Sequence, residues 1–74
     1  MKEADSLDVR PIERYARFGT IMERLSQMQR GDSLTIINDF EPFPLYDELG
    51  ARGFEYHTEK ASDEEFRITV KKVS

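Results

Sequence analysis

Three short stretches of the chain alternate apolar with polar residues, the pattern of a β-strand with one packed and one exposed face. They cover residues 6–10, 54–59 and 66–71. A fourth stretch, residues 33–38, is rich in β-branched side chains and predicts a central, mostly buried strand. The polar segment 60–65 joins the last two strands and indicates a β-hairpin.

Two segments between these strands show the three- and four-residue spacing of an amphipathic helix. The longer one spans residues 12–29, and Gly31 beyond it suits the left-handed position that often follows a helix. The shorter one spans residues 44–51 and carries proline in its first turn, where proline is tolerated. The apolar stripe predicted for the longer helix consists of Tyr15, Phe18, Ile21, Met22, Leu25 and Met28.

The order of these elements predicts an α+β fold. It is a two-layer β-α-β-α-β-β sandwich in which two helices cover one face of a four-stranded mixed sheet. The 74 residues suffice for one small domain with a modest hydrophobic core. We expect this domain to span residues 6–74, after a polar and disordered N-terminus at residues 1–5.

Composition narrows the possible functions. The 15 acidic and 11 basic residues give a net charge of −4, which disfavours nonspecific binding to nucleic acid or anionic membranes. Six Lys or Arg and five acidic residues lie in residues 1–31, against five and ten in residues 32–74. The absence of cysteine excludes disulfides, thiol nucleophiles and thiolate metal sites. Without a membrane-spanning apolar run or a signal-peptide pattern, we expect a cytoplasmic protein.

One string of residues stands out between the second strand and the second helix. It consists of Asn38, Asp39, Phe40, Glu41, Pro42, Phe43, Pro44 and Leu45. With the Leu-Asp-Val-Arg stretch before the first helix, it resembles the TusA/SirA-like superfamily, and more closely an uncharacterised branch with an Asn-Asp-His-Asp-Pro-like motif. The resemblance covers about residues 6–72. It implies the same fold, in a domain that occurs alone or beside hemerythrin-like or cupin domains.

The chain departs from this resemblance at the residues that would carry chemistry. TusA-like sulfur carriers hold a cysteine about where Arg14 stands here. Persulfide transfer needs a thiolate, so sulfur-carrier activity is excluded. Phenylalanine also stands where the branch carries histidines, as Phe18 in the first helix and Phe40 in the loop. The resemblance therefore implies the fold without its best metal or proton-transfer ligands.

The candidate site is a rim formed by three arginines and the loop from Asn38 to Pro42. Arg10 should lie near the start of the helix that carries Arg14 and Arg17, and arginines can grip a carboxylate, a phosphate or an RNA backbone. The alternative is a solvated helix flank whose arginines pair with nearby acidic side chains. The full candidate set is Arg10, Arg14, Arg17, Asn38, Asp39, Phe40 and Glu41.

Other polar residues offer weaker chemistry. Asp39 and Glu41 could act as an acid/base pair or hold a hard cation. The alternative has Asn38 or Asp39 closing the turn and Glu41 solvated near a helix amino terminus. His57, the single histidine, alternates with glutamates on the exposed face of the hairpin, where cross-strand pairing is the ordinary explanation. We assign no catalytic, cofactor-binding or metal-binding residue.

We therefore expect a non-catalytic binding or regulatory module that acts through the rim on an acidic protein or a small anionic ligand. One alternative is a small-molecule-, metal- or redox-linked accessory domain that has lost the histidines; a weaker one is RNA binding by the basic first helix. Phe18 and Phe40 are expected to form an aromatic pair that closes a ligand corner. Alternatively, an exposed Phe40 would anchor a partner protein.

Overall fold

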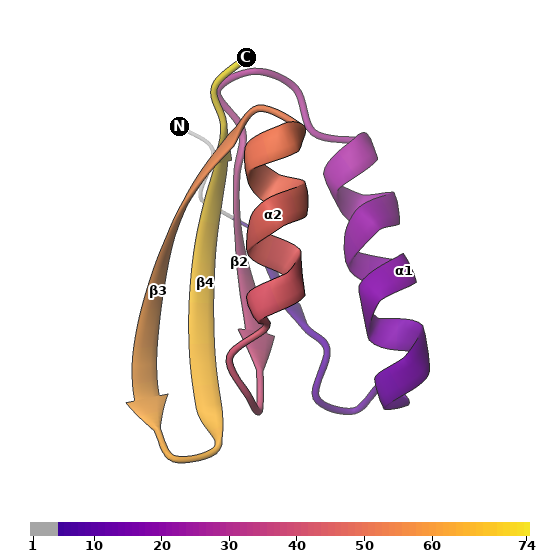
Figure 1. Cartoon of the computed structure of the whole chain (residues 1–74), viewed down its shortest axis with the longest axis vertical. Coiled ribbons are helices and arrows are strands. Elements are labelled where there is room, and N and C mark those ends of the chain that lie inside the picture. The colour runs from indigo at the N-terminus through magenta and orange to yellow at the C-terminus, as the bar shows by residue number, and fades with distance from the viewer. Residues whose placement is uncertain (1–4) are drawn as a thin grey trace.

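The computed structural model describes residues 5–74 as one sheet covered by two helices (Figure 1). The elements are β1 (Asp5–Asp8), α1 (Arg14–Ser26), β2 (Ser33–Asn38), α2 (Phe43–Ala51), β3 (Phe54–Ser62) and β4 (Glu65–Lys72). The strand order is β1-β2-β4-β3; β1 and β2 are parallel, and the other neighbours are antiparallel. The predicted α+β sandwich is confirmed. Within residues 5–74, neither helix is long and apolar enough to cross a membrane.

The core lies between the helices and the sheet face that they cover. β2 buries every second residue, and in β4 Ile68 and Val70 are buried while Arg67 and Thr69 are exposed. This alternation follows from the two-residue period of a strand. The core residues are Val9, Ile21, Leu25, Leu34, Ile36, Leu45, Leu49, Phe54, Ile68 and Val70.

The first two strands differ from their predictions. β1 covers residues 5–8 instead of 6–10, although the Val9 N–H still donates to the Ile37 carbonyl at 3.0 Å. Asp5 thus belongs to β1, and the rest of the predicted disordered N-terminus, residues 1–4, lies outside the described residues. β2 is central but half-buried at alternate positions instead of mostly buried, because both helices lie on the same face of the sheet (Figure 1).

The predicted hairpin loop at residues 60–65 is wrong. β3 continues to Ser62 and β4 begins at Glu65, with an irregular register between Lys60 and Ser62. The polar side chains of this segment do not stop the backbone from pairing, since they point into solvent while the backbone groups bond across the hairpin. His57 lies opposite Thr69 on the exposed face, in agreement with the expected cross-strand pairing.

The first helix is shorter than predicted and buries a different stripe. α1 covers residues 14–26 instead of 12–29, and its buried face is Arg17, Ile21 and Leu25, at four-residue steps. Tyr15, predicted to belong to the apolar stripe, is 88% exposed, and Phe18 is 43% exposed. Four-residue steps keep side chains on one side of a helix, so a buried arginine continues the row that Ile21 and Leu25 define.

The register of β4 makes a stability prediction. Ile68→Ala should cost about 2–5 kcal/mol, because it leaves a cavity in the core of a small domain. Thr69→Ala, on the exposed face, should cost less than about 1 kcal/mol. Urea unfolding of both variants measures the difference, and equal losses would contradict the register.

Candidate functional site

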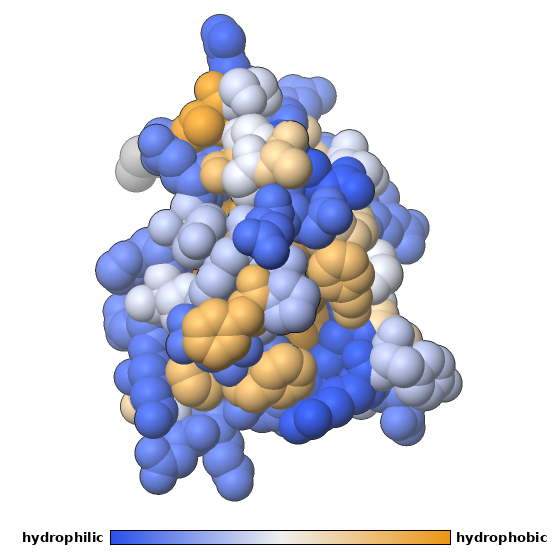
Figure 2. Space-filling model, in the orientation of Figure 1, coloured by the Kyte–Doolittle hydropathy of each residue, from blue (hydrophilic) through white to orange (hydrophobic). Residues whose placement is uncertain are grey.

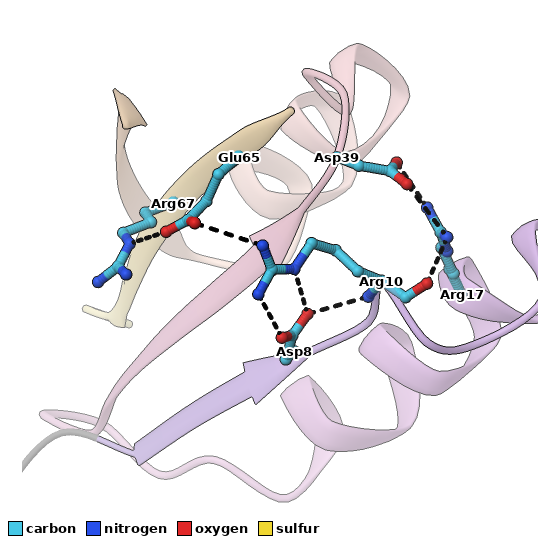
Figure 3. A network of polar contacts seen from close by, with 6 residues as sticks. All are labelled: Asp8, Arg10, Arg17, Asp39, Glu65 and Arg67. Carbon is cyan, nitrogen blue, oxygen red and sulfur yellow. Dashed lines mark hydrogen bonds and ion pairs between the residues drawn. The ribbon is translucent and has the colours of Figure 1, made fainter. Parts of the chain in front are cut away.

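Arg17 joins the two loops at the edge of the sheet where the candidate residues lie. Its side chain reaches from α1 and donates through Nε to the Ile12 carbonyl and through Nη2 to the Arg10 carbonyl, both at 2.8 Å. Through Nη1 it donates to Asn38 Oδ1 at 3.0 Å and to Asp39 Oδ1 at 2.8 Å. Figure 3 shows the bonds to Arg10 and Asp39. Arg17 is 9% exposed, so the alternative of a solvated helix flank is wrong about its exposure, although Arg17 does pair with a nearby acid, Asp39.

The loop after β2 is fixed by this contact. Asn38 is buried, accepts from Arg17 and donates through Nδ2 to the Phe40 carbonyl at 2.9 Å, which closes the turn as predicted. The Arg17 guanidinium lowers the pKa of the Asp39 carboxyl by hydrogen bonding and by its charge. Asp39 is therefore engaged as the anionic partner of a buried cation, which makes it a poor general base.

A pocket of about 290 Å³ opens beside this loop, between the first half of α1 and the start of α2. Figure 2 shows apolar surface gathered over the lower part of the face, where both helices begin. We call this cavity the corner pocket. It is lined by Arg14, Arg17, Phe18, Ile21, Asn38, Phe40, Pro42, Pro44 and Leu45.

Arg14 is the exposed cation of the corner pocket. Its guanidinium carbon lies 4.6 Å from the centre of the Phe40 ring, a distance at which the ring attracts the charge. Within residues 5–74, Arg14 makes no ion pair. Arg17 lies farther from the same ring, at 6.0 Å, and its donors are already in use.

Phe18 and Phe40 line the same pocket but do not close it. They are 43% and 37% exposed, and the ring–ring contacts found in residues 5–74 do not include this pair. The prediction that Phe18 and Phe40 form an aromatic pair is therefore wrong. The ring of Phe40 packs against Arg14 instead, so the two phenylalanines form part of the walls of an accessible cavity.

Arg10 does not belong to the corner pocket. Its side chain donates to both carboxylate oxygens of Asp8, at 2.9 and 2.7 Å, and to Glu65 at 3.3 Å (Figure 3). Glu65 also accepts from Arg67 at 2.6 Å. The hydrogen bond from Arg67 lowers the pKa of Glu65, and the hydrogen bond from Arg10 lowers the pKa of Asp8. This alternating chain of charges ties β1 to β4, and it removes Arg10 from the arginines available to a ligand at the pocket.

Glu41 also turns away from the rim, toward a cluster that the sequence analysis missed. It accepts a hydrogen bond from the Tyr46 hydroxyl at 2.9 Å, and this hydroxyl also contacts Thr58 Oγ1 at 2.5 Å. Burial raises the pKa of Tyr46. The Tyr46 ring stacks on Tyr56, with centroids 4.4 Å apart, so α2 and β3 are joined by aromatic contact. The available signal was the alternation of Tyr56 with its polar neighbours, which places it on the same sheet face as Phe54 and Thr58.

The acidic residues and His57 are scattered. Within residues 5–74, no three His, Cys, Asp or Glu side chains lie close enough together to hold a metal ion.

The sequence model of a family described as "Uncharacterized conserved protein (DUF2249)" matches residues 6–72. Because this match covers almost the whole chain, the protein belongs to that family. No curated protein and no solved structure gives a significant match.

Arg17→Ala should lower the free energy of unfolding by about 2–4 kcal/mol, because it leaves the buried Asn38 amide and two loop carbonyls without this donor. Arg24→Ala is the control: Arg24 pairs with Asp5 near the surface, at 3.2 Å, and its loss should cost less than about 1 kcal/mol. Chemical denaturation measures both values. A loss at Arg17 no larger than that at Arg24 would show that the two loops do not depend on this contact.

The lowered pKa of Asp39 predicts acid sensitivity. The Arg17–Asp39 pair should stabilise the fold fully above the pKa of an unfolded aspartate, about 3.9, and progressively less as the pH falls toward the lower folded-state pKa. Urea unfolding near neutral pH and at about pH 3 should show this loss of stability. Asp39→Asn should make stability less dependent on pH in that range, and an unchanged dependence would contradict the assignment.

Proposed function

We propose that the domain is a non-catalytic binding module whose ligand places an apolar group in the corner pocket. The observation that carries the proposal is an accessible cavity whose walls include Phe18, Ile21, Phe40 and Leu45, with a cation at its edge. Ligand sites typically combine apolar walls with a few polar groups that orient the ligand. A volume of about 290 Å³ suits one small ligand or one large side chain.

The residues of the corner pocket favour binding over catalysis. Its lining includes no Ser, Thr, Cys, Lys or His side chain, the groups that most often serve as nucleophiles or proton-transfer residues. The polar groups of Arg17 and Asn38 are engaged in holding the loops. RNA binding gains little support, because Arg10, Arg17 and Arg24 all pair with carboxylates of the chain itself.

We also propose that the domain is related to TusA/SirA-like domains and that the protein is cytoplasmic. The resemblance puts Arg14 about where the sulfur carriers hold their cysteine, and Arg14 lines the corner pocket. A position used for transfer chemistry in that superfamily would then serve ligand contact here.

Protein docking is a second candidate, favoured by aromatic side chains outside the pocket. Tyr15 is 88% exposed, and Phe43 is 66% exposed. The Phe43 ring meets the Tyr46 ring edge-on at 6.0 Å, which continues the aromatic surface toward Tyr56. Exposed aromatic clusters of this kind are enriched in protein interfaces.

A screen of small aromatic and aliphatic fragments by ¹⁵N NMR tests the proposal. We expect shift changes centred on Phe18, Ile21 and Leu45, and binding weakened about tenfold by Phe40→Ala, which removes one wall. Phe43→Ala is the matched control, because Phe43 is exposed nearby but does not line the pocket. Shifts centred on Phe43 and Tyr56 would favour the docking surface instead. A screen without any response at the corner pocket would contradict the proposal.

A further inference from the structure

The corner pocket is cationic at its edge although the protein as a whole carries a net charge of −4. Two arginines and one acidic side chain meet there: Arg14, Arg17 and Asp39, the last held by Arg17 at 2.8 Å. Arg17 and Asp39 form an ion pair, whereas Arg14 makes no ion pair within residues 5–74. The other acids near this end are Glu41, which accepts from the Tyr46 hydroxyl, and Glu13, the residue before Arg14.

The helices add to this positive character. α1 begins at Arg14 and α2 begins at Phe43, so both amino-terminal ends lie at the pocket. The amino-terminal end of a helix carries partial positive charge. Neither helix has an acidic residue in its first turn, and the nearest acids are Glu13, the N-cap residue of α1, and Glu41, which precedes the N-cap of α2.

The walls of the corner pocket determine the shape of the apolar part of the ligand. Phe18 and Phe40 present aromatic rings, while Ile21 and Leu45 are buried core residues that form the apolar interior. A dry apolar cavity of about 150 Å³ is known to hold benzene, so about 290 Å³ has room for one aromatic ring and a short acidic chain. The rings can pack against a planar ligand in stacked or edge-on geometry.

Arg14 sets the chemistry of the other end. A guanidinium offers a planar fork of N–H donors that matches a carboxylate in two parallel hydrogen bonds. The Arg14 guanidinium is held against the Phe40 ring at 4.6 Å, which restricts its freedom before any ligand arrives. One unneutralised cation matches a monoanion better than a phosphate ester that carries two charges.

From these observations we infer that the ligand is a small aromatic monocarboxylate, whose ring enters the corner pocket and whose carboxylate is bound by Arg14. This inference rests on the proposed function and adds the chemical class of the ligand. Because the ligand is small and lies partly exposed, its affinity should be weak, and NMR titration is the suitable measurement.

Four probes of related shape separate the contributions of ring and charge. Phenylacetate carries both features, phenylacetamide keeps the ring without the charge, phenethylamine reverses the charge, and acetate lacks the ring. We expect phenylacetate to bind most tightly, with shift changes at Phe18, Ile21 and Phe40. Phenylacetamide and acetate should each bind about tenfold more weakly, and phenethylamine weakest of all.

Arg14→Gln tests the residue that recognises the anion. It should weaken phenylacetate binding about tenfold and phenylacetamide binding much less, because the amide carries no charge to lose a partner. Arg24→Gln is the matched control, since it removes a helix arginine that lies outside the corner pocket. Arg14 is exposed, so unfolding is not expected to obscure the result.

The possible failures differ in what they overturn. Equal binding of phenylacetate and phenylacetamide, or full phenylacetate affinity in Arg14→Gln, would overturn the carboxylate assignment and leave the pocket as a binding site. Acetate binding as tightly as phenylacetate would overturn the aromatic part. If no probe and no fragment of the broader screen perturbs the pocket, the proposed function itself fails.

Discussion

The buried guanidinium of Arg17 is the contact on which the two loops beside the corner pocket depend. Both loops that it bonds leave the ends of strands, and neither has a regular hydrogen-bond ladder of its own to fix its shape. By holding Asn38, which in turn binds the Phe40 carbonyl, Arg17 determines where one wall of the corner pocket stands. Burying a charge carries a large desolvation cost that its partners must offset. The contact is therefore better understood as specifying a loop geometry than as a large net source of stability.

The fold could be predicted from the sequence because each element carries a local signal. Alternation in β4 and the β-branched composition of β2 reflect a sheet with one covered face, and Gly31 indeed has a positive φ of 96°. The burial of Arg17 could not be predicted with the same ease, since charged residues are rarely buried unless paired. Its partners are the Asn38 amide and two backbone carbonyls. These groups come together only when the chain is folded. The four-residue step from Arg17 to Ile21 and Leu25 did indicate the buried face of α1. Phe18, the apolar residue next to Arg17, made a different stripe look more apolar.

The candidate rim illustrates why a group of like charges in a sequence is a weak guide to a site. Arg10 is captured by Glu65, which lies 55 residues away in the chain and reaches it through the pairing of β1, β2 and β4. The donors of Arg17 are bonded to the two loops. Of the three arginines, Arg14 is the one that lines the corner pocket and makes no ion pair within residues 5–74. The distinction between a structural and a ligand-facing arginine thus depends on long-range pairing, which local sequence patterns do not contain. The proposed anion site therefore depends on this one residue in a protein whose net charge is negative.

The sheet also separates the beginning of β1 and the end of β4 from the corner pocket. Asp5 pairs with Leu34 and Lys71 pairs with Ser33, so the first described strand and the last one meet the beginning of β2, whereas the pocket loop follows its end. Figure 1 shows the C-terminus at the top of the molecule and the start of α2 near the bottom. The long axis of the molecule, 31 Å in extent, runs in this direction. A tether at the carboxyl end, whether a sensor surface, a bead or a fused domain, would consequently leave the corner pocket facing away from the point of attachment.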